Sequence, residues 1–337
     1  MDTIEIFSTY QFSEAELQRL QAISSRLRIR QQAVRDENDW PDDLDSVEVM
    51  CLRGAVPTDL ARFPRLRWLH IPWAGVEFLL DHPVRHSQVV VTNASGVHAT
   101  PIAEHVFALL LALARHLPKM LAHQAQASWP KGAWNAFRSP ELRGMTLGII
   151  GYGSIGREVG RLGAAFGMTV LACNRSGVRT PDTGWREAGV GDLDGSIPAA
   201  WYSPARLLEM LPQCDAVVLA APLTAESQGI IGREALAAMK PTAYFINIAR
   251  GAQVDQDALV EALRAGRIAG AGLDVVTPEP LPSDHPLWRM ENVILSPHVS
   301  ASTPEWGRRV CDVFAENLRR YVAGEPLLNQ VDWERGY

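Results

Sequence analysis

The sequence lacks the features that would assign it to several special classes. Its 32 Lys and Arg do not outnumber its 38 Asp and Glu, so neither nucleic acid nor an anionic membrane is indicated as a partner. The N-terminus, MDTIEIFSTY, has neither the basic start nor the apolar run of a signal peptide. The longest apolar run, VFALLLALA, is about half the ~20 residues that a spanning helix needs, which predicts a buried helix.

Cysteine is scarce and scattered. Cys51, Cys173, Cys214 and Cys311 lie far apart, and no two form a C-x-x-C pair. We expect four buried thiols in a reducing cytoplasm, and we expect no metal site.

The length and the pattern predict two α/β domains. A chain of 337 residues is long enough for two ordinary cores. The first hundred residues alternate short β-like runs with helical segments, and Ser13 followed by Glu16 has the spacing of a capping box. The stretch TPIAEHVFALLLALARHL predicts an apolar helix with Thr100 as N-cap and Pro101 at its first position.

From Met145 onward, short apolar strands alternate with helices, which predicts a parallel sheet covered on both faces. Helices are expected at 154–166 and at 255–265, the second capped by Asp255 and Gly266. The amphipathic helix that follows Pro304 is expected to return to the first domain. We therefore predict one domain from residues 1–101 and 303–337, and a second from residues 102–302.

Residues 177–203 interrupt this rhythm with five glycines and no periodicity, which predicts a long loop. Loops of this length are often functional, as lids or interface arms. A tolerated insertion is the alternative.

The stretch GYGSIG supplies the spacing G-x-G-x-x-G between a strand and a helix. Gly151 permits the tight turn, Gly153 lets the backbone approach a pyrophosphate, and Gly156 lets the helix pack on the strand. The free N–H groups and the positive dipole end of the helix add to this anion site. The stretch predicts a dinucleotide site.

The end of the next strand, LACNRSG, is where an Asp or Glu for the adenosine ribose is expected, and it carries Asn174, Arg175 and Ser176 instead. A guanidinium beside a hydroxyl is suited to a 2′-phosphate, so the sequence predicts NADP(H). The alternative is an ordinary polar turn with a solvated arginine.

Three further strand ends carry candidate reacting groups, namely Arg250, Glu279 and His298. Ligands bind at the carboxyl ends of such strands. An anion clamp, a carboxylate that keeps a proton donor charged, and an acid/base are what hydride transfer to a 2-keto acid requires. Taken singly, each also has a structural explanation: an ion pair, a solvated turn and a surface histidine.

Six stretches carry a resemblance to a known family: NASGVHATPIAEH, GIIGYGSIG, APLTAESQGII, FINIARGAQVDQDAL, AGLDVVTPEPLP and NVILSPHVS. From about Val47 to Val322, the chain resembles the D-isomer-specific 2-hydroxyacid dehydrogenases. The resemblance implies a Rossmann-like, doubly wound parallel-sheet domain and a flavodoxin-like α/β substrate domain with the active site in the cleft between them. It implies a catalytic triad of Arg250, Glu279 and His298, with His298 donating the proton to the keto oxygen.

The resemblance also implies the binding residues. The substrate carboxylate would meet the backbone of Ala74, Gly75 and Val76. The cofactor would meet Gly151, Gly153, Ser154, Ile155, Gly156, Asn174, Arg175, Ser176, Pro222, Ser227, Ile248, Ala249, Asp274 and Ala301. Two departures are that the acid usual in NAD-using members is missing at Asn174, and that Ala220 and Ala221 stand where many relatives have a histidine.

We therefore predict a cytoplasmic, NADP-preferring 2-hydroxyacid dehydrogenase or 2-keto acid reductase, with NAD possible. A homodimer is expected from the resemblance and from the apolar 102–117 helix. The alternative function is a corepressor-like protein that senses nucleotides on the same fold. The sequence leaves the keto acid open, and it leaves open whether Trp73 and Trp134 line the cleft or pack an interface.

Overall fold

The structure is a computed structural model that describes residues 3–36 and 39–336, and the chain forms two compact units. One unit, which we call the five-stranded unit, comprises Met1–His98, Thr183–Glu187 and Thr303–Tyr337. The other, the seven-stranded unit, comprises Ala99–Asp182 and Ala188–Ser302. A short piece of the predicted 177–203 loop thus belongs to the five-stranded unit.

Within the described residues, the five-stranded unit contains one parallel sheet in the order β2-β1-β3-β4-β5. Its strands are β1 (Ile4–Ser8), β2 (Leu27–Gln31), β3 (Val47–Cys51), β4 (Trp68–Ile71) and β5 (Val90–Asn93). Its helices are α1 (Glu14–Gln21) and α9 (Trp306–Ala323). The capping box predicted from Ser13 and Glu16 is confirmed at the start of α1.

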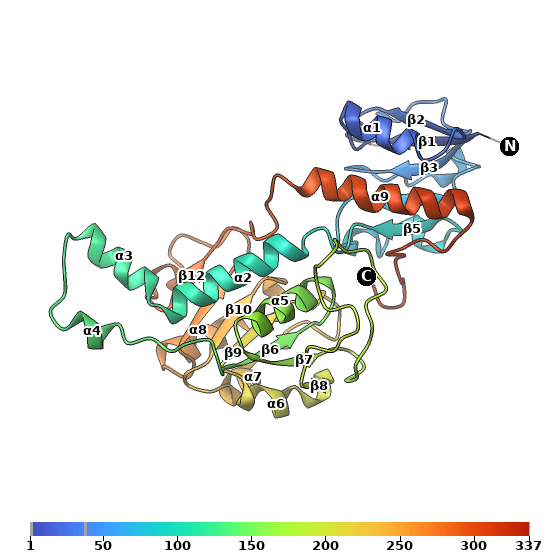
Figure 1. Ribbon diagram of the computed structural model, residues 1–337. Coiled ribbons are helices and arrows are strands. Elements are labelled where there is room, and N and C mark those ends of the chain that lie inside the picture. The colour runs from blue at the N-terminus through green and yellow to red at the C-terminus, as the bar shows by residue number, and fades with distance from the viewer. Residues whose placement is uncertain (1–2, 37–38, 337) are drawn as a thin grey trace. The chain divides into compact units, whose positions relative to one another are not determined.

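Helix α9 lies beside this sheet and closes its core (Figure 1). Val310, Phe314 and Leu318 are fully buried and pack in one cluster with Ile4 and Trp68. The helix ends at Gly324, whose left-handed backbone (φ 72°) is easy for glycine. The amphipathic helix predicted after Pro304 is therefore confirmed.

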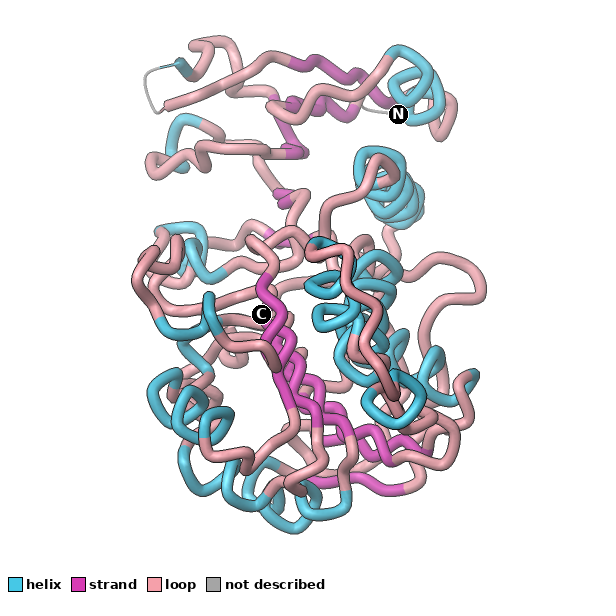
Figure 2. The backbone as a smooth tube through the Cα atoms, turned by 90° about the vertical axis from the view of Figure 1, so that its left-hand side faces the viewer, coloured by secondary structure: helices cyan, strands magenta, loops and turns pink. Residues whose placement is uncertain are grey.

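The described part of the seven-stranded unit contains a second parallel sheet, in the order β12-β11-β10-β9-β6-β7-β8. The strands are β6 (Thr146–Ile150), β7 (Thr169–Cys173), β8 (Ala200–Tyr202), β9 (Ala216–Leu219), β10 (Tyr244–Asn247), β11 (Gly270–Leu273) and β12 (Val293–Leu295). The helices are α2 (Ala99–Ala114), α3 (Leu117–Ala125), α4 (Ala133–Ala136), α5 (Ser154–Ala165), α6 (Leu207–Met210), α7 (Arg233–Ala238) and α8 (Gln256–Arg264). Figure 2 shows these strands with helices on both sides, as predicted.

Short 3-10 turns complete the described elements. They are η2 (Leu60–Arg62), η3 (Glu77–Leu79), η4 (Pro83–His86), η5 (Pro204–Arg206), η6 (Leu211–Gln213), η7 (Gly251–Gln253) and η8 (Pro286–Arg289).

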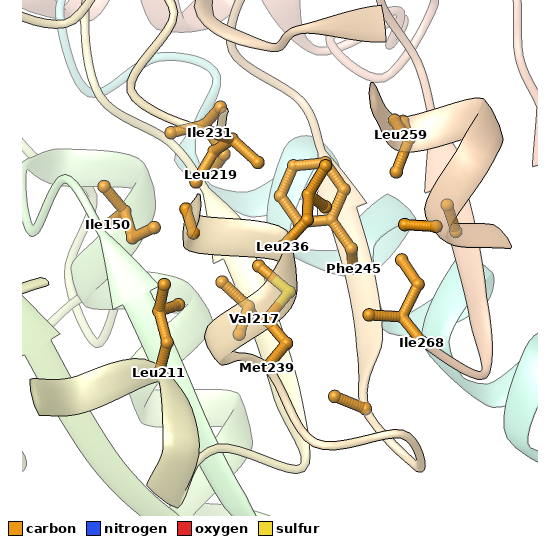
Figure 3. Packing of buried hydrophobic residues seen from close by; sticks show 14 of the residues in the cluster. Ile150, Leu211, Val217, Leu219, Ile231, Leu236, Met239, Phe245, Leu259 and Ile268 are labelled. Carbon is orange, nitrogen blue, oxygen red and sulfur yellow. The ribbon is translucent and has the colours of Figure 1, made fainter. Parts of the chain in front are cut away.

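Each face of the larger sheet has its own hydrophobic core. On one face, Val217 and Phe245 pack with Leu236, Met239 and Leu259, as Figure 3 shows. Burial of a side chain such as Phe245 stabilises the fold by roughly 1.5–3 kcal/mol. These two cores make the carboxyl edge of the sheet a rigid base for the loops that leave it.

Helix α2 closes the opposite face, where its apolar side chains join Ile149, Val218 and Ile246. It begins at Ala99, so Thr100 is the second helical residue and Pro101 the third, and the predicted N-cap at Thr100 is wrong. Among the described residues no single helix is long and apolar enough to cross a membrane, although α2 and α3 pass that test as a pair bent by 66°.

All four cysteines are free and buried, as predicted. Burial raises the pKa of the Cys173, Cys214 and Cys311 thiols to about 12, and it also raises the pKa of Cys51. They therefore act as small apolar core residues.

Candidate active site

The predicted reacting groups follow three neighbouring strands of the larger sheet. Arg250 lies after β10, Glu279 after β11 and His298 after β12. Because parallel strands end at the same edge, the topology brings these loops to one side of the sheet.

His298 and Glu279 form a direct pair. The imidazole Nδ1 lies 2.8 Å from Glu279 Oε2, and the two side chains are 49% and 39% exposed. The backbone N–H of Val276 donates to the other carboxylate oxygen at 3.2 Å, which fixes the carboxylate. His298 itself has a left-handed backbone (φ 54°), unusual for a residue other than glycine and frequent at functional sites.

Asp274 organises the loop that carries His298. Its carboxylate is 2% exposed and accepts hydrogen bonds from the Ser296 hydroxyl and from the backbone N–H groups of Val299 and Ser300. Burial raises the pKa of Asp274, but these hydrogen bonds outweigh burial and hold the pKa below its ordinary value. The backbone N–H of His298 also donates to the Asp274 carbonyl at 2.9 Å.

His105 is a further candidate site residue that sequence reasoning missed. It extends from α2, and its Nε2 lies 2.9 Å from the Ser296 hydroxyl and 3.7 Å from the Asp274 carboxylate. Its position within TPIAEH, one of the stretches that carry the family resemblance, was the available signal.

The loop of Arg250 is joined closely to the loop of Glu279. A Cβ placed on Gly251 would lie 2.0 Å from the carbonyl oxygen of Val276, so only glycine allows this approach. Gln253 is fully buried and was also missed by sequence reasoning. Its side chain accepts from the backbone N–H of Arg250 at 3.2 Å and donates to the carbonyl of Pro222 at 3.1 Å.

The three glycines of GYGSIG have the geometry that a dinucleotide requires. Gly151 has φ 95°, and a Cβ there would lie 2.4 Å from the backbone nitrogen of Ala221. A Cβ on Gly156 would lie 2.1 Å from the Gly151 carbonyl oxygen. Around Gly153, by contrast, no heavy atom of the described chain beyond its two chain neighbours lies within 4 Å of a Cβ, so the start of α5 is open to a pyrophosphate.

The turn after β7 is closed largely by its own side chains. Asn174 accepts from the Gly177 backbone N–H at 2.7 Å and from the Ser176 hydroxyl at 3.2 Å, and it donates to the Val178 carbonyl. Arg175 is 60% exposed and reaches the Glu226 carboxylate at 4.0 Å. A hydrogen bond from Thr224, with a smaller contribution from Arg175, lowers the pKa of Glu226.

The remaining predicted cofactor residues lie along the same edge. Ser227 donates to the carbonyl of Pro222 at 2.8 Å and thereby closes the loop after β9. Ile248 and Ala249 are buried after β10, whereas Ser154, Ile155 and Ala301 are partly exposed. Ala220 and Ala221 are also partly exposed.

The predicted substrate residues Ala74, Gly75 and Val76 belong to the five-stranded unit and follow β4. The Asn93 side chain donates to the Ala74 carbonyl at 3.0 Å. Trp73 packs against Trp306 in the same unit, with 5.9 Å between ring centroids. Trp134, in the other unit, is 88% exposed.

Comparison with known proteins agrees with this geometry. Residues 107–300 match the family described as "D-isomer specific 2-hydroxyacid dehydrogenase, NAD binding domain". A glyoxylate reductase of Korarchaeum cryptofilum is 40% identical over 248 residues, which cover 73% of this chain and 70% of the relative.

Solved structures of similar proteins cover the whole length. A D-isomer-specific 2-hydroxyacid dehydrogenase of Xanthobacter autotrophicus Py2, in complex with NADPH and MES, is 31% identical with a TM-score of 0.80 over 100% of both chains. An NADPH-dependent glyoxylate/hydroxypyruvate reductase of Sinorhizobium meliloti, in complex with NADP and sulfate, is 25% identical with a TM-score of 0.76 over 99% of this chain and 100% of that chain. The chain therefore belongs to the D-isomer-specific 2-hydroxyacid dehydrogenase family.

Proposed function

We propose that this NAD(P)-dependent 2-hydroxyacid dehydrogenase reduces small 2-keto acids, with His298 as proton donor and Arg250 as carboxylate clamp. The observation that carries the proposal is the 2.8 Å pair of His298 and Glu279 at a sheet edge that also holds a dinucleotide loop. When bound, a reduced nicotinamide would supply the hydride to the keto carbon.

His298 and Glu279 handle the proton. The Glu279 carboxylate is hydrogen-bonded to Nδ1 of His298, so Nε2 is the ring nitrogen that donates the proton to the keto oxygen. The negative charge of Glu279 stabilises the protonated ring before transfer. In the reverse direction the neutral ring accepts the hydroxyl proton of a 2-hydroxy acid.

Arg250 holds the substrate carboxylate. A guanidinium can bond a carboxylate through two parallel N–H groups, which orients the adjacent keto carbon. Gln253 fixes the backbone from which Arg250 extends. The family resemblance also implies that the backbone N–H groups of residues 74–76 donate to the substrate carboxylate.

We propose NADP(H) as the preferred cofactor. Asn174 stands where an acid would repel a 2′-phosphate, and it is followed by Arg175 and Ser176. Both related structures named above are complexes with NADPH or NADP. Glu226 opposes the preference because it lies near the same guanidinium. Asn174 Oδ1 already accepts two hydrogen bonds within its own turn, so Asn174 would reach a ribose hydroxyl through the second N–H of Nδ2.

Glyoxylate and hydroxypyruvate are the substrates to test first. The Korarchaeum cryptofilum relative is described as a glyoxylate reductase, and the Sinorhizobium meliloti relative as a glyoxylate/hydroxypyruvate reductase. Both are short 2-keto acids with a carboxylate for Arg250.

We also propose a homodimer, formed through α3, α4 and the segment between them. Most apolar side chains of the predicted interface helix, 102–117, are instead buried in the core of the seven-stranded unit. Exposed apolar side chains lie just after it, with Leu121 62%, Trp129 92% and Trp134 88% exposed. Trp129 and Trp134 also line a hollow of about 900 Å³. Figure 1 shows α3 and α4 projecting from the larger sheet.

Replacing Leu121 and Trp129 by serine should therefore shift the protein from dimer to monomer in analytical ultracentrifugation. A wild type that sediments as a monomer would remove this proposal.

We also propose that the protein is cytoplasmic, because four free buried thiols suit a reducing compartment.

The experiment that tests the mechanism is His298→Ala. Loss of general acid catalysis should lower kcat for glyoxylate reduction by ~10²-fold or more, with the Kd for NADPH nearly unchanged. A variant that keeps wild-type turnover would remove His298 from the mechanism.

A further inference from the structure

A segment of the predicted 177–203 loop docks into the five-stranded unit. This arm, Thr183–Glu187, belongs to that unit although the chain on either side of it belongs to the other. Trp185 at its centre is 9% exposed and lies in the core cluster that also contains Ala94 and Val97. A Cβ on Gly96 would lie 2.2 Å from the Trp185 carbonyl oxygen, so the two backbones are in close contact.

Charge fixes the end of the arm. The Glu187 carboxylate accepts from Arg309 at 2.7 Å and from Arg308. Burial raises the pKa of Glu187, but hydrogen bonds and charge from Arg308 and Arg309 outweigh it and hold that pKa below its ordinary value. The arm is thus held both by an apolar anchor and by an ion-pair network.

The arm also contacts Asn329. The backbone N–H of Trp185 donates to Asn329 Oδ1 at 2.9 Å. Asn329 Nδ2 donates to the carbonyls of Asn93 and Ser95, at 3.1 and 2.9 Å. Asn329 has φ 55°, a left-handed conformation that asparagine tolerates better than most residues.

The next contact is with the substrate loop, which we define as residues 74–76. Asn93 Nδ2 donates to the Ala74 carbonyl at 3.0 Å, and the backbone N–H of Ala94 donates to the Trp73 carbonyl at 2.8 Å. The start of the substrate loop is therefore tied to the same segment that Asn329 holds.

We propose that Asn329, held by the arm, is a positioning residue that fixes the substrate loop through Asn93. The role rests on the proposed function, in which the backbone of the substrate loop binds the substrate carboxylate. In this proposal the 177–203 insertion has a function, because its arm orders the substrate loop although the two segments are far apart in the sequence.

The test compares Asn329→Asp with Asn329→Gly. Aspartate keeps the acceptor for Trp185 but loses both donors, whereas glycine removes the whole side chain and keeps the left-handed backbone accessible. In both variants KM for glyoxylate should rise about tenfold, equivalent to ~1.4 kcal/mol. The kcat and the Kd for NADPH should stay close to wild type.

Asn292→Asp is the matched control. Asn292 likewise donates from its side chain to two backbone carbonyls, those of Leu263 and Ala269, but in the other unit. It should lower Tm without raising KM. A KM that is unchanged in both Asn329 variants, or that rises equally in the control, would overturn the proposal.

Amide hydrogen exchange at Gly75 and Val76 separates this proposal from the proposed function. Both Asn329 variants should exchange faster than wild type at these amides, whatever the substrate. If the wild type reduces no keto acid but exchange still responds, the proposed function fails and the positioning role stands. Unchanged exchange would refute the positioning role itself.

Discussion

Two side-chain pairs, each with a glutamate carboxylate, lie at the carboxyl edge of the larger sheet, and they differ in how firmly they are held. His298 and Glu279, after β12 and β11, are 2.8 Å apart and are fixed by backbone donors. Arg175 and Glu226, after β7 and β9, are 4.0 Å apart and mostly exposed. On the proposed function, we infer that proton transfer uses a pair that the fold holds firmly, whereas cofactor choice depends on an exposed contact that salt screens.

The largest effect is expected at the firm pair. Glu279→Gln keeps the shape of the side chain but removes the charge that stabilises the protonated imidazole. Because general acid catalysis is worth ~10²–10⁴-fold, kcat for glyoxylate should fall on the order of 10²-fold. Steady-state kinetics with saturating NADPH would measure this. A loss below about twofold would mean that the pair is structural only.

A smaller loss is expected for Arg250→Lys. The substitution keeps the charge but cannot make two parallel bonds to a carboxylate. Loss of one hydrogen bond to a charged group costs roughly 1.5–3 kcal/mol. The kcat/KM for the keto acid should therefore fall by about tenfold to a hundredfold. Equal kcat/KM for lysine and arginine would show that the fork geometry is irrelevant at this position.

At the loose pair, Arg175→Ala should weaken NADPH binding about tenfold, at the low end for a bond to a charged group because the site is screened. NADH binding should be almost untouched, since NADH has no 2′-phosphate. Titration of both cofactors at fixed ionic strength measures the difference. Equal loss of both cofactors would contradict the assignment.

The smallest effect is expected for Glu226→Gln. Removing the carboxylate frees Arg175 and takes away a negative charge near the 2′-phosphate. The preference for NADPH over NADH should increase by about threefold, because an exposed pair is worth less than ~1 kcal/mol. A decrease in this preference would show that Glu226 supports the arginine in place of competing with it.

The sequence was sufficient to predict those features of the site that depend on residues close together in the chain. GYGSIG lies in one strand-turn-helix, and Arg250, Glu279 and His298 each follow a strand directly, so topology alone brings their loops to one edge. The cap at Ser13 and the helix after Asp255 were predicted for the same reason.

Features that depend on distant contacts could not be predicted. Strand β2 is half exposed, and β8 has only three residues, so neither has a strong apolar pattern. The N–H of Trp185 meets Asn329, which is 144 positions away. Gln253 acts through burial and through the carbonyl of Pro222, and its residue type carries no such signal.

The most direct test of the account is the reduction of glyoxylate by the wild-type protein with NADPH and with NADH. We predict that cofactor is oxidised in step with glyoxylate, with kcat/KM at least about tenfold higher for NADPH. Turnover in this assay would argue against the alternative function, a corepressor-like sensor that binds the nucleotide without reducing a keto acid. No oxidation of either cofactor with glyoxylate, hydroxypyruvate, pyruvate, phenylpyruvate or a branched-chain keto acid would contradict the account.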